Sequence, residues 1–198
     1  MSALKVYGIP QSRAARVLWM VEECGVPYEL VSTHYSKEAK TDAYRMLNPN
    51  GRVPTIDDGG VVVWESMAIN LYLAKKYGGD LAPKNLAEEA HANQWSFWVM
   101  TEVEKAALGA LMARAAKDDA QSAKALDDLR APLGVLNGHL AKNEYVLGSR
   151  FTVADLNVAS VLNWVTAARV NLGEWPKVEA WLAKCQGRPA AQKARAIR

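Results

Sequence analysis

The segment 53–66 constrains the fold of this chain more than any other stretch of its sequence. Two short runs rich in β-branched residues, 53–57 and 61–64, flank an Asp-Gly pair, so the segment predicts a β-hairpin with a tight turn. Pro54 opens the first run and has no N–H, so the ladder of hydrogen bonds must be interrupted there. The backbone groups of Val53 therefore need a partner other than the neighbouring strand.

An acidic residue and a hydroxyl residue follow this hairpin, where a helical pattern begins. Glu65 and Ser66 bring a carboxylate, a hydroxyl and unpaired helix-start N–H groups to one point. A strand edge beside such a cluster suits a small peptide that carries both an amine and a carboxylate. An edge-strand proline next to an ordinary helix cap is the structural alternative, and the hairpin alone does not decide between them.

The first eighty residues alternate between strand and helix patterns. The period-2 and period-3.6 patterns predict the order β-α-β-α-β-β-α, with a parallel first βαβ unit and an antiparallel hairpin. The result is a small mixed sheet with helices on its faces. The expected strands are 4–7, 28–32 and the two hairpin runs, and the expected helices are 12–24, 37–47 and 67–77.

After a Gly- and Pro-containing linker at 79–86 no strand pattern recurs. The remaining patterns predict an all-α domain at 87–198, and Pro132 either kinks or breaks the second long helix. The fold class is therefore an α/β domain at 1–78 followed by a helical domain. The expected helices run from about 85 to 116, 121 to 142, 152 to 169, 175 to 186 and 188 to 195.

Residues 152–155 form a capping box, with Phe151 and Leu156 placed as its hydrophobic staple. Asp155 is thus expected to be buried and polar. A carboxylate that satisfies helix N–H groups is a better reading of Asp155 than a catalytic acid.

Composition excludes several classes of protein. The formal net charge of +3 over 198 residues, without a concentrated Lys and Arg stretch, does not favour nucleic-acid binding. No apolar run approaches the ~18 residues of a membrane span, and no signal peptide opens the sequence. Cys24 and Cys185 are far apart and fit a reducing cytoplasm. The three histidines show no metal-ligand spacing, so no metal is expected.

Taken in order and at their spacing, several short motifs resemble the cytosolic glutathione S-transferases, and the resemblance spans essentially the whole chain. It is nearest to the serine-type branch, close to the phi and theta classes and to many bacterial members. It implies a thioredoxin-like N-terminal domain, an all-α domain and a cis peptide at Val53-Pro54. The motifs are 5–12 (KVYGIPQS), 16–17 (RV), 22–23 (EE), 48–54 (NPNGRVP), 65–69 (ESMAI) and 151–155 (FTVAD), with Pro176, Trp181 and 188–189 (RP).

The resemblance makes the thiol of glutathione the working group. A free thiol has a pKa near ~8.5, so the protein must stabilise the thiolate, which is the nucleophile. Ser12 follows the first strand and is expected to open the first helix, where its hydroxyl can donate to the sulfur. A plain N-cap serine is the structural alternative. Tyr7 is a rival donor, although its place inside the strand favours a core role.

The resemblance also implies how the rest of the tripeptide is held. Val53, before Pro54, is expected to pair its backbone with the cysteinyl unit. Glu65 is expected to take the γ-glutamyl ammonium and Ser66 the carboxylate. Two basic residues, Lys40 and the weaker candidate Arg52, lie where relatives bind the glycine carboxylate, and a solvated lysine on the short polar helix is the structural alternative for Lys40.

Asn50 occupies a position that is often aromatic in relatives, and in those relatives the aromatic side chain helps to clasp the partner subunit. A homodimer remains the expectation. The expected partners are glutathione and a small electrophile, with no nucleic acid and no membrane.

The expected reaction is conjugation of glutathione to small apolar electrophiles, in keeping with a detoxifying role. Two alternatives stay open: a glutathione-dependent peroxidase or dehalogenase, and a non-catalytic carrier or adaptor of the same fold. The acceptor pocket is expected beside the 9–11 loop and the first long helix, with Trp95, Trp98 and Trp164 as apolar candidates.

Overall fold

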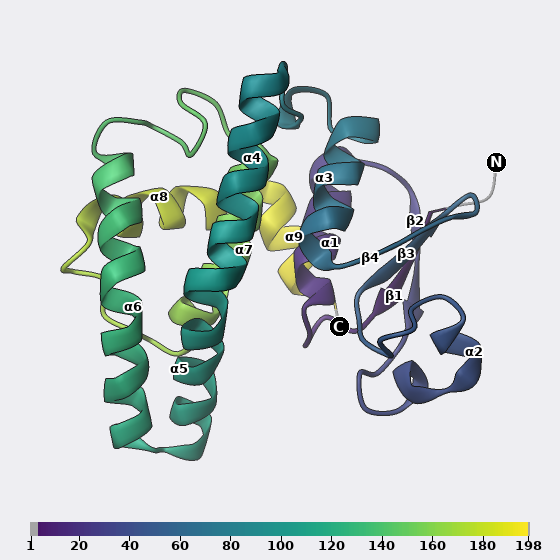
Figure 1. Ribbon diagram of the computed structural model, residues 1–198, viewed down its shortest axis with the longest axis horizontal. Helices are drawn as coiled ribbons and strands as arrows, with labels where there is room; N and C mark the ends of the chain where they lie inside the picture. The colour runs from purple at the N-terminus through teal and green to yellow at the C-terminus, as the bar shows by residue number, and fades with distance from the viewer. Residues whose placement is uncertain (1–3, 198) are drawn as a thin grey trace. The chain divides into compact units, whose positions relative to one another are not determined.

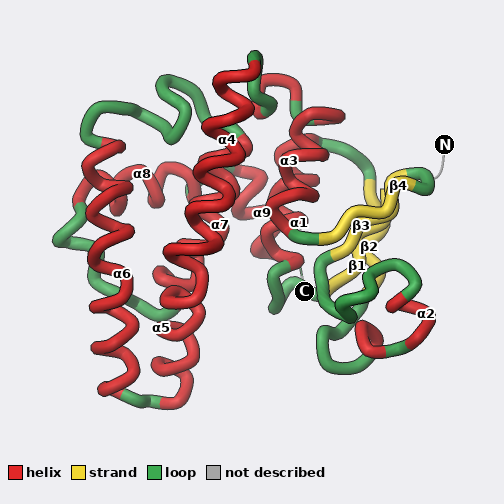
Figure 2. Tube along the Cα trace, viewed as in Figure 1, coloured by secondary structure: helices red, strands yellow, loops and turns green. Residues whose placement is uncertain are grey.

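The computed structural model describes residues 4–197, which form two compact units (Figures 1 and 2). The first unit runs to Ala82 and also takes in the residues from Arg188 onward; the second is Pro83–Gly187. The sequence patterns assigned the whole of 87–198 to one helical domain. The structure instead groups the last helix with the first unit.

The first unit is built on a four-stranded mixed sheet with the strand order β2-β1-β3-β4. β1 pairs with β2 in parallel and with β3 antiparallel, and β3 and β4 form the expected hairpin. Gly59 and Gly60 make its turn, with φ of 64° and 97°, and Asp57 Oδ1 accepts the Gly60 N–H at 2.7 Å. The strands are β1 Leu4–Gly8, β2 Tyr28–Ser32, β3 Thr55–Asp58 and β4 Val61–Trp64.

Helices cover both faces of this sheet. In Figure 1, α1 and α3 lie together on one side of it and α2 on the other. Val6 and Ile56 are paired across β1 and β3 and are fully buried. The opposite face carries Thr55, whose Oγ1 lies 2.8 Å from the Tyr44 hydroxyl of α2. The helices are α1 Ala14–Cys24, α2 Asp42–Arg45, α3 Ser66–Tyr77 and α9 Pro189–Ala196.

The single helix expected at 37–47 is divided in the structure. Glu38–Lys40 forms a 3₁₀ turn, and α2 is only four residues long. Thr41 separates them because its backbone is extended and its Oγ1 accepts the Tyr44 N–H at 3.3 Å. A threonine that caps from within the pattern ends one turn and starts the next.

The last helix, α9, is tied to α1 by charged side chains. Arg188 donates through Nε and Nη2 to the two carboxylate oxygens of Glu23, at 2.7 and 2.8 Å. Lys193 pairs with Glu22, and the side chains of both glutamates are more than nine-tenths buried. Bidentate pairing of this kind is strong and directional. It explains why an eight-residue helix belongs to the first unit.

The second unit is helical, with α7 at its centre. α7 packs against α4, α5 and α8, and its residues from Val153 to Leu162 are all buried. A helix whose residues are buried on every side is one that neighbouring helices enclose. The helices of the unit are α4 Leu86–Trp98, α5 Glu104–Ala116, α6 Asp119–Leu140, α7 Val153–Ala167 and α8 Pro176–Gln186; Pro132 lies inside α6 without ending it.

A π-helical segment, Val99–Val103, joins α4 to α5, so the expected long helix is continuous but changes its winding. The side chain of Thr101 donates to the carbonyls of Phe97 and Trp98. Inserting a wider turn rotates the following residues around the axis. Trp95 before the segment and Ala107 after it are therefore both buried while α4 and α5 each pack on α7.

The capping box of α7 is confirmed. Asp155 Oδ1 accepts the Val146 N–H at 2.8 Å and the Trp181 Nε1–H at 3.0 Å. Asp155 Oδ2 accepts the N–H and the hydroxyl of Thr152 at 2.9 and 3.1 Å. Four donors thus saturate a carboxylate that has no solvent exposure.

Among residues 4–197, no helix combines the length and the apolar character that crossing a membrane would require.

Candidate functional site

The loop after β1 carries Ser12, which is half-buried. Its hydroxyl donates to the Ile9 carbonyl at 2.7 Å, and its Oγ accepts the Ala14 N–H at 3.1 Å. α1 begins at Ala14, with Arg13 as its N-cap, so Ser12 precedes the helix by two residues instead of opening it. The cause is local, since the hydrogen bond from the Ala14 N–H to Ser12 Oγ holds the chain in a turn before the helix.

Gly8 allows this loop to leave the strand. Its φ is 156°, and a Cβ built there would lie 2.4 Å from the Cβ of Ala14. Any side chain at Gly8 would therefore push the first turn of α1 away from the end of β1. The close approach keeps Ser12 next to the strand end.

Tyr7 lies in the same strand but packs differently. Its ring contacts an apolar cluster of Ala39, Tyr44 and Val53, and its centroid is 6.1 Å from that of Tyr44 in an edge-on arrangement. This packing favours the core role over the rival role as thiol donor.

The peptide bond between Val53 and Pro54 is cis, as the family resemblance implied. The chain before it is held firmly, because the Arg52 carbonyl accepts from the Tyr44 hydroxyl and from Asn48 Nδ2, both at 2.8 Å. The register of β3 with its neighbours begins at Thr55. The backbone of Val53 therefore lies outside the ladder, while its side chain is buried.

At the start of α3, Glu65 and Ser66 have contrasting environments. Glu65 is exposed, adopts φ 74° and ψ 115°, and makes no side-chain capping bond. A non-glycine residue at positive φ is uncommon and costs about 1–3 kcal/mol, which the surrounding fold must offset. Ser66 is 3 % exposed, and its Oγ accepts a hydrogen bond from Arg16 Nη1 at 3.3 Å.

Arg16 was not among the predicted site residues, although the Arg-Val pair at 16–17 was one of the family marks. It lies on α1 and is only 2 % exposed. The signal available in the sequence was its place on the first helix directly before the apolar residues Val17 and Leu18, because an arginine on an enclosed face is rarely without partners.

The two basic candidates lie on the surface around the 39–52 loop. Lys40 donates to the Gly51 carbonyl at 2.7 Å, and Arg52 is exposed. Gly51 has φ 57°, and a Cβ there would lie 2.8 Å from the Ala39 carbonyl oxygen, so the loop is closed tightly beneath Lys40. Asn50 Nδ2 donates to Asn48 Oδ1 at 3.1 Å within the same turn.

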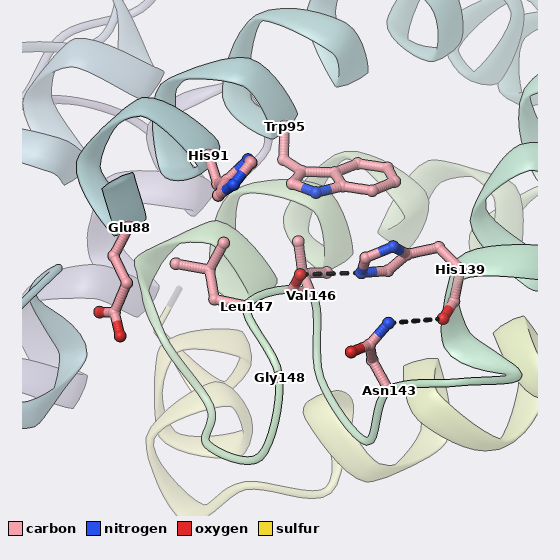
Figure 3. A pocket seen from close by; sticks show the side chains of 8 residues that line it. All are labelled: Glu88, His91, Trp95, His139, Asn143, Val146, Leu147 and Gly148. Atoms are coloured by element: carbon pink, nitrogen blue, oxygen red, sulfur yellow. Dashed lines mark hydrogen bonds between the residues drawn. The ribbon is translucent and has the colours of Figure 1, made fainter. Parts of the chain in front are cut away.

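The helical unit contains a pocket of about 220 Å³ on α4, the end of α6 and the following loop (Figure 3). Its polar groups are engaged by the protein. His139 Nε2 lies 2.9 Å from the Val146 carbonyl, Asn143 donates to the His139 carbonyl, and Glu88 pairs with Arg150. Trp95, a predicted acceptor-pocket residue, lines this pocket, with its ring centroid 4.8 Å from that of His139. The pocket therefore receives no ligand assignment.

Among the residues that the structure describes, no group of three or more His, Cys, Asp or Glu side chains could hold a metal ion.

Comparison with known proteins identifies two domains along the chain. Residues 2–75 match the glutathione S-transferase N-terminal domain, and residues 99–189 match the C-terminal domain. Glutathione S-transferase 3 of Zea mays is 35% identical, over 98% of this chain and 93% of that protein. Glutathione S-transferase D7 of Drosophila melanogaster is 32% identical, over 92% of this chain and 84% of its own length.

Solved structures give the same answer. Glutathione S-transferase-I bound with lactoylglutathione has a TM-score of 0.89 at 30% identity, with full coverage of both chains. The theta class enzyme of Xanthomonas axonopodis pv. citri, with glutathione bound, has a TM-score of 0.88 at 32% identity, covering 100% of this chain and 99% of that one. Glutathione S-transferase I from mais, in complex with an atrazine glutathione conjugate, has a TM-score of 0.88 at 29% identity, covering 98% and 97%. With both domain matches and these relatives in agreement, the chain belongs to the glutathione S-transferase family.

Proposed function

We propose that this protein conjugates glutathione to small apolar electrophiles. The carrying observation is the open start of α3, where strained, exposed Glu65 adjoins Ser66 in a chain whose structural relatives hold glutathione or its conjugates. In the reaction the thiol loses its proton to solvent, its sulfur forms a bond to an electrophilic carbon, and the leaving group departs with the electron pair of its bond. No metal takes part.

The tripeptide would be held by groups that the protein's own bonding leaves available. Val53 offers a backbone outside the sheet ladder, which suits pairing with the cysteinyl unit. Glu65 offers an exposed carboxylate for the γ-glutamyl ammonium, and Ser66 offers a hydroxyl and a helix-start N–H for the carboxylate. Lys40 and Arg52 are exposed cations for the glycine carboxylate.

Ser12 would stabilise the thiolate. Its hydroxyl now donates to the Ile9 carbonyl, so it must rotate away from that oxygen to donate to sulfur. Ser12 Oγ accepts a hydrogen bond from the Ala14 N–H. This bond supports the role, because it polarises the hydroxyl and makes it a better donor. The Ser12 proton is never transferred.

A panel assay on the wild type and Ser12→Ala tests this function. A hydrogen bond to a charged group is worth about 1.5–3 kcal/mol, so conjugation of an activated aryl halide should fall about tenfold to a hundredfold. Ser36→Ala, which removes an exposed hydroxyl elsewhere in the same unit, is the matched control. An unchanged rate in Ser12→Ala refutes the serine role. Reduction of organic hydroperoxides without conjugation would identify a peroxidase, and failure to bind glutathione at millimolar concentration a carrier or adaptor.

We also infer a homodimer that works in the cytoplasm. β4 is an edge strand of the sheet and exposes Val61, Val62 and Trp64, an apolar edge that a second copy could cover. Sedimentation at twice the chain mass, lost in Trp64→Lys, is the expected result. Both cysteines are free thiols, in keeping with a reducing compartment. Cell fractionation tests the location, and a role in detoxification would follow from the range of electrophiles accepted.

A further inference from the structure

A buried cation lies behind the open start of α3. Arg16 is on α1, four residues after Ser12, and its Nη1 lies 3.3 Å from Ser66 Oγ. Both residues are almost wholly enclosed, at 2 % and 3 % exposure. An arginine keeps its charge in proteins, so Arg16 places a permanent positive charge behind the Ser66 hydroxyl.

We propose that Arg16 is a positioning residue for the ligand's γ-glutamyl carboxylate, acting through Ser66. This inference rests on the function proposed above and names a group that touches neither the ligand nor the sulfur. Arg16 would set the direction in which the Ser66 hydroxyl donates and would add a positive charge behind it.

The hydrogen bond from Arg16 fixes the direction in which the Ser66 hydroxyl can donate. A guanidinium has only donors, so Ser66 Oγ must accept from Arg16. The hydroxyl proton of Ser66 must then point away from Arg16 and can serve as a donor. Ser66 is also the first residue of α3, where the N–H has no partner within the helix. The two donors of one residue are thus both available to an anion.

The positive charge of Arg16 also acts on the ligand directly. A unit positive charge in a poorly hydrated place attracts an anion beyond hydrogen-bond distance more strongly than it would in water. A hydroxyl that accepts from a cation is also a better donor in its own right. Arg16 therefore favours a charged carboxylate over a neutral amide at the same position.

A purely structural role makes a different prediction. α1 and α3 pack on each other, and Asn70 Nδ2 of α3 donates to the Arg16 carbonyl at 3.4 Å, so Arg16 could simply link two helices. Losing such a link would weaken binding of every ligand alike. Discrimination between two ligands that differ only in one charge separates the roles.

The test compares glutathione with its analogue in which the γ-glutamyl α-carboxylate is an α-carboxamide. Arg16→Gln should weaken glutathione binding about tenfold, measured by calorimetry, while changing affinity for the carboxamide less than about twofold. KM for glutathione should rise similarly, with kcat changed less than about threefold. Arg16→Lys should restore part of the preference for the charged ligand.

Controls keep the inference separable from the function. Lys5→Gln removes one positive charge from a partly exposed lysine of the same unit, which pairs with Glu29, and should leave both affinities unchanged. Ser66→Ala should lose the same discrimination as Arg16→Gln. If Arg16→Gln does not fold, Arg16→Lys and Ser66→Ala carry the comparison. Equal losses for both ligands, or none, would overturn the inference alone, whereas a wild type that binds neither ligand would also overturn the proposed function.

Discussion

The starts of α3 and α7 are built from the same residue types and are used in opposite ways. At α7, Asp155 accepts four hydrogen bonds and has no exposure. At α3, Glu65 is exposed, makes no capping bond and holds a strained backbone. Both sites pair an acid with a hydroxyl residue, Thr152 in one case and Ser66 in the other.

Hydrogen-bond occupancy separates a structural acid from a ligand-binding one. The oxygens of Asp155 are fully occupied by the protein, so its carboxylate has little capacity left for a ligand. Glu65 carries backbone strain without a side-chain capping bond, which is expected where a fold prepares a binding site. The two acids differ in whether the protein itself fills the hydrogen-bonding capacity of the carboxylate, and not in residue type.

The largest effect should come from opening the closed site. Asp155→Ala leaves the N–H groups of Val146 and Thr152 and the indole N–H of Trp181 buried without their acceptor. Each orphaned donor costs about 1–3 kcal/mol, so the free energy of unfolding should fall by at least about 3 kcal/mol in urea titrations. Asp119→Ala, at the exposed start of α6, is the control and should cost less than about 1 kcal/mol. Equal free energies of unfolding for the two variants would contradict the structural role of Asp155.

Neutralising the open site should affect binding and not stability. Glu65→Gln keeps the size and removes the charge, so affinity for glutathione should fall about tenfold to a hundredfold through loss of a bond to the ammonium. Calorimetry measures the binding constant and urea titration the unfolding free energy. A stability loss as large as that of Asp155→Ala would show that Glu65 is also a structural acid.

A third carboxylate, that of Asp58, should make the stability of the fold depend on pH. Burial alone would raise the pKa of Asp58, but hydrogen bonds from Lys76, Tyr72 and Tyr77 outweigh it and hold that pKa below its ordinary value. A lowered pKa stabilises the fold above the unfolded pKa of ~3.9, and this contribution is lost as pH falls through the folded pKa.

Asp58→Asn should therefore cost about 1–3 kcal/mol at pH 7, and its difference from the wild type should narrow only below about pH 4. Urea titrations of both proteins across that range measure the difference. A gap that stays constant down to the lowest pH at which both proteins fold would mean that Asp58 contributes no charge-dependent stability.

The smallest effect is expected at Tyr7. Its ring packs against Tyr44 in the apolar cluster, so Tyr7→Phe keeps that packing and should change the conjugation rate less than about twofold. Steady-state kinetics beside Ser12→Ala make the measurement. A larger loss in Tyr7→Phe than in Ser12→Ala would transfer the thiol-donor role to the tyrosine.

Local sequence patterns predicted much of this fold. The hairpin, the parallel βαβ unit and the capping box of α7 were predictable because each depends on residues close together in the chain. The start of α1 and the helix at 37–47 were predicted less well. There, the side-chain oxygens of Ser12 and Thr41 bond to nearby backbone and override a helical periodicity.

By itself the sequence determined the elements, their order and the residue types gathered around Pro54 and Glu65, since these follow from period, turn chemistry and caps. Only the tertiary structure decided which polar groups stay available: it enclosed Arg16 behind Ser66, saturated Asp155, and bound α9 to α1 through Glu23. The pairs Ser66–Arg16, Asp155–Trp181 and Glu23–Arg188 are 50, 26 and 165 residues apart. Whether a charge is buried, paired or open depends on neighbours that no local pattern specifies.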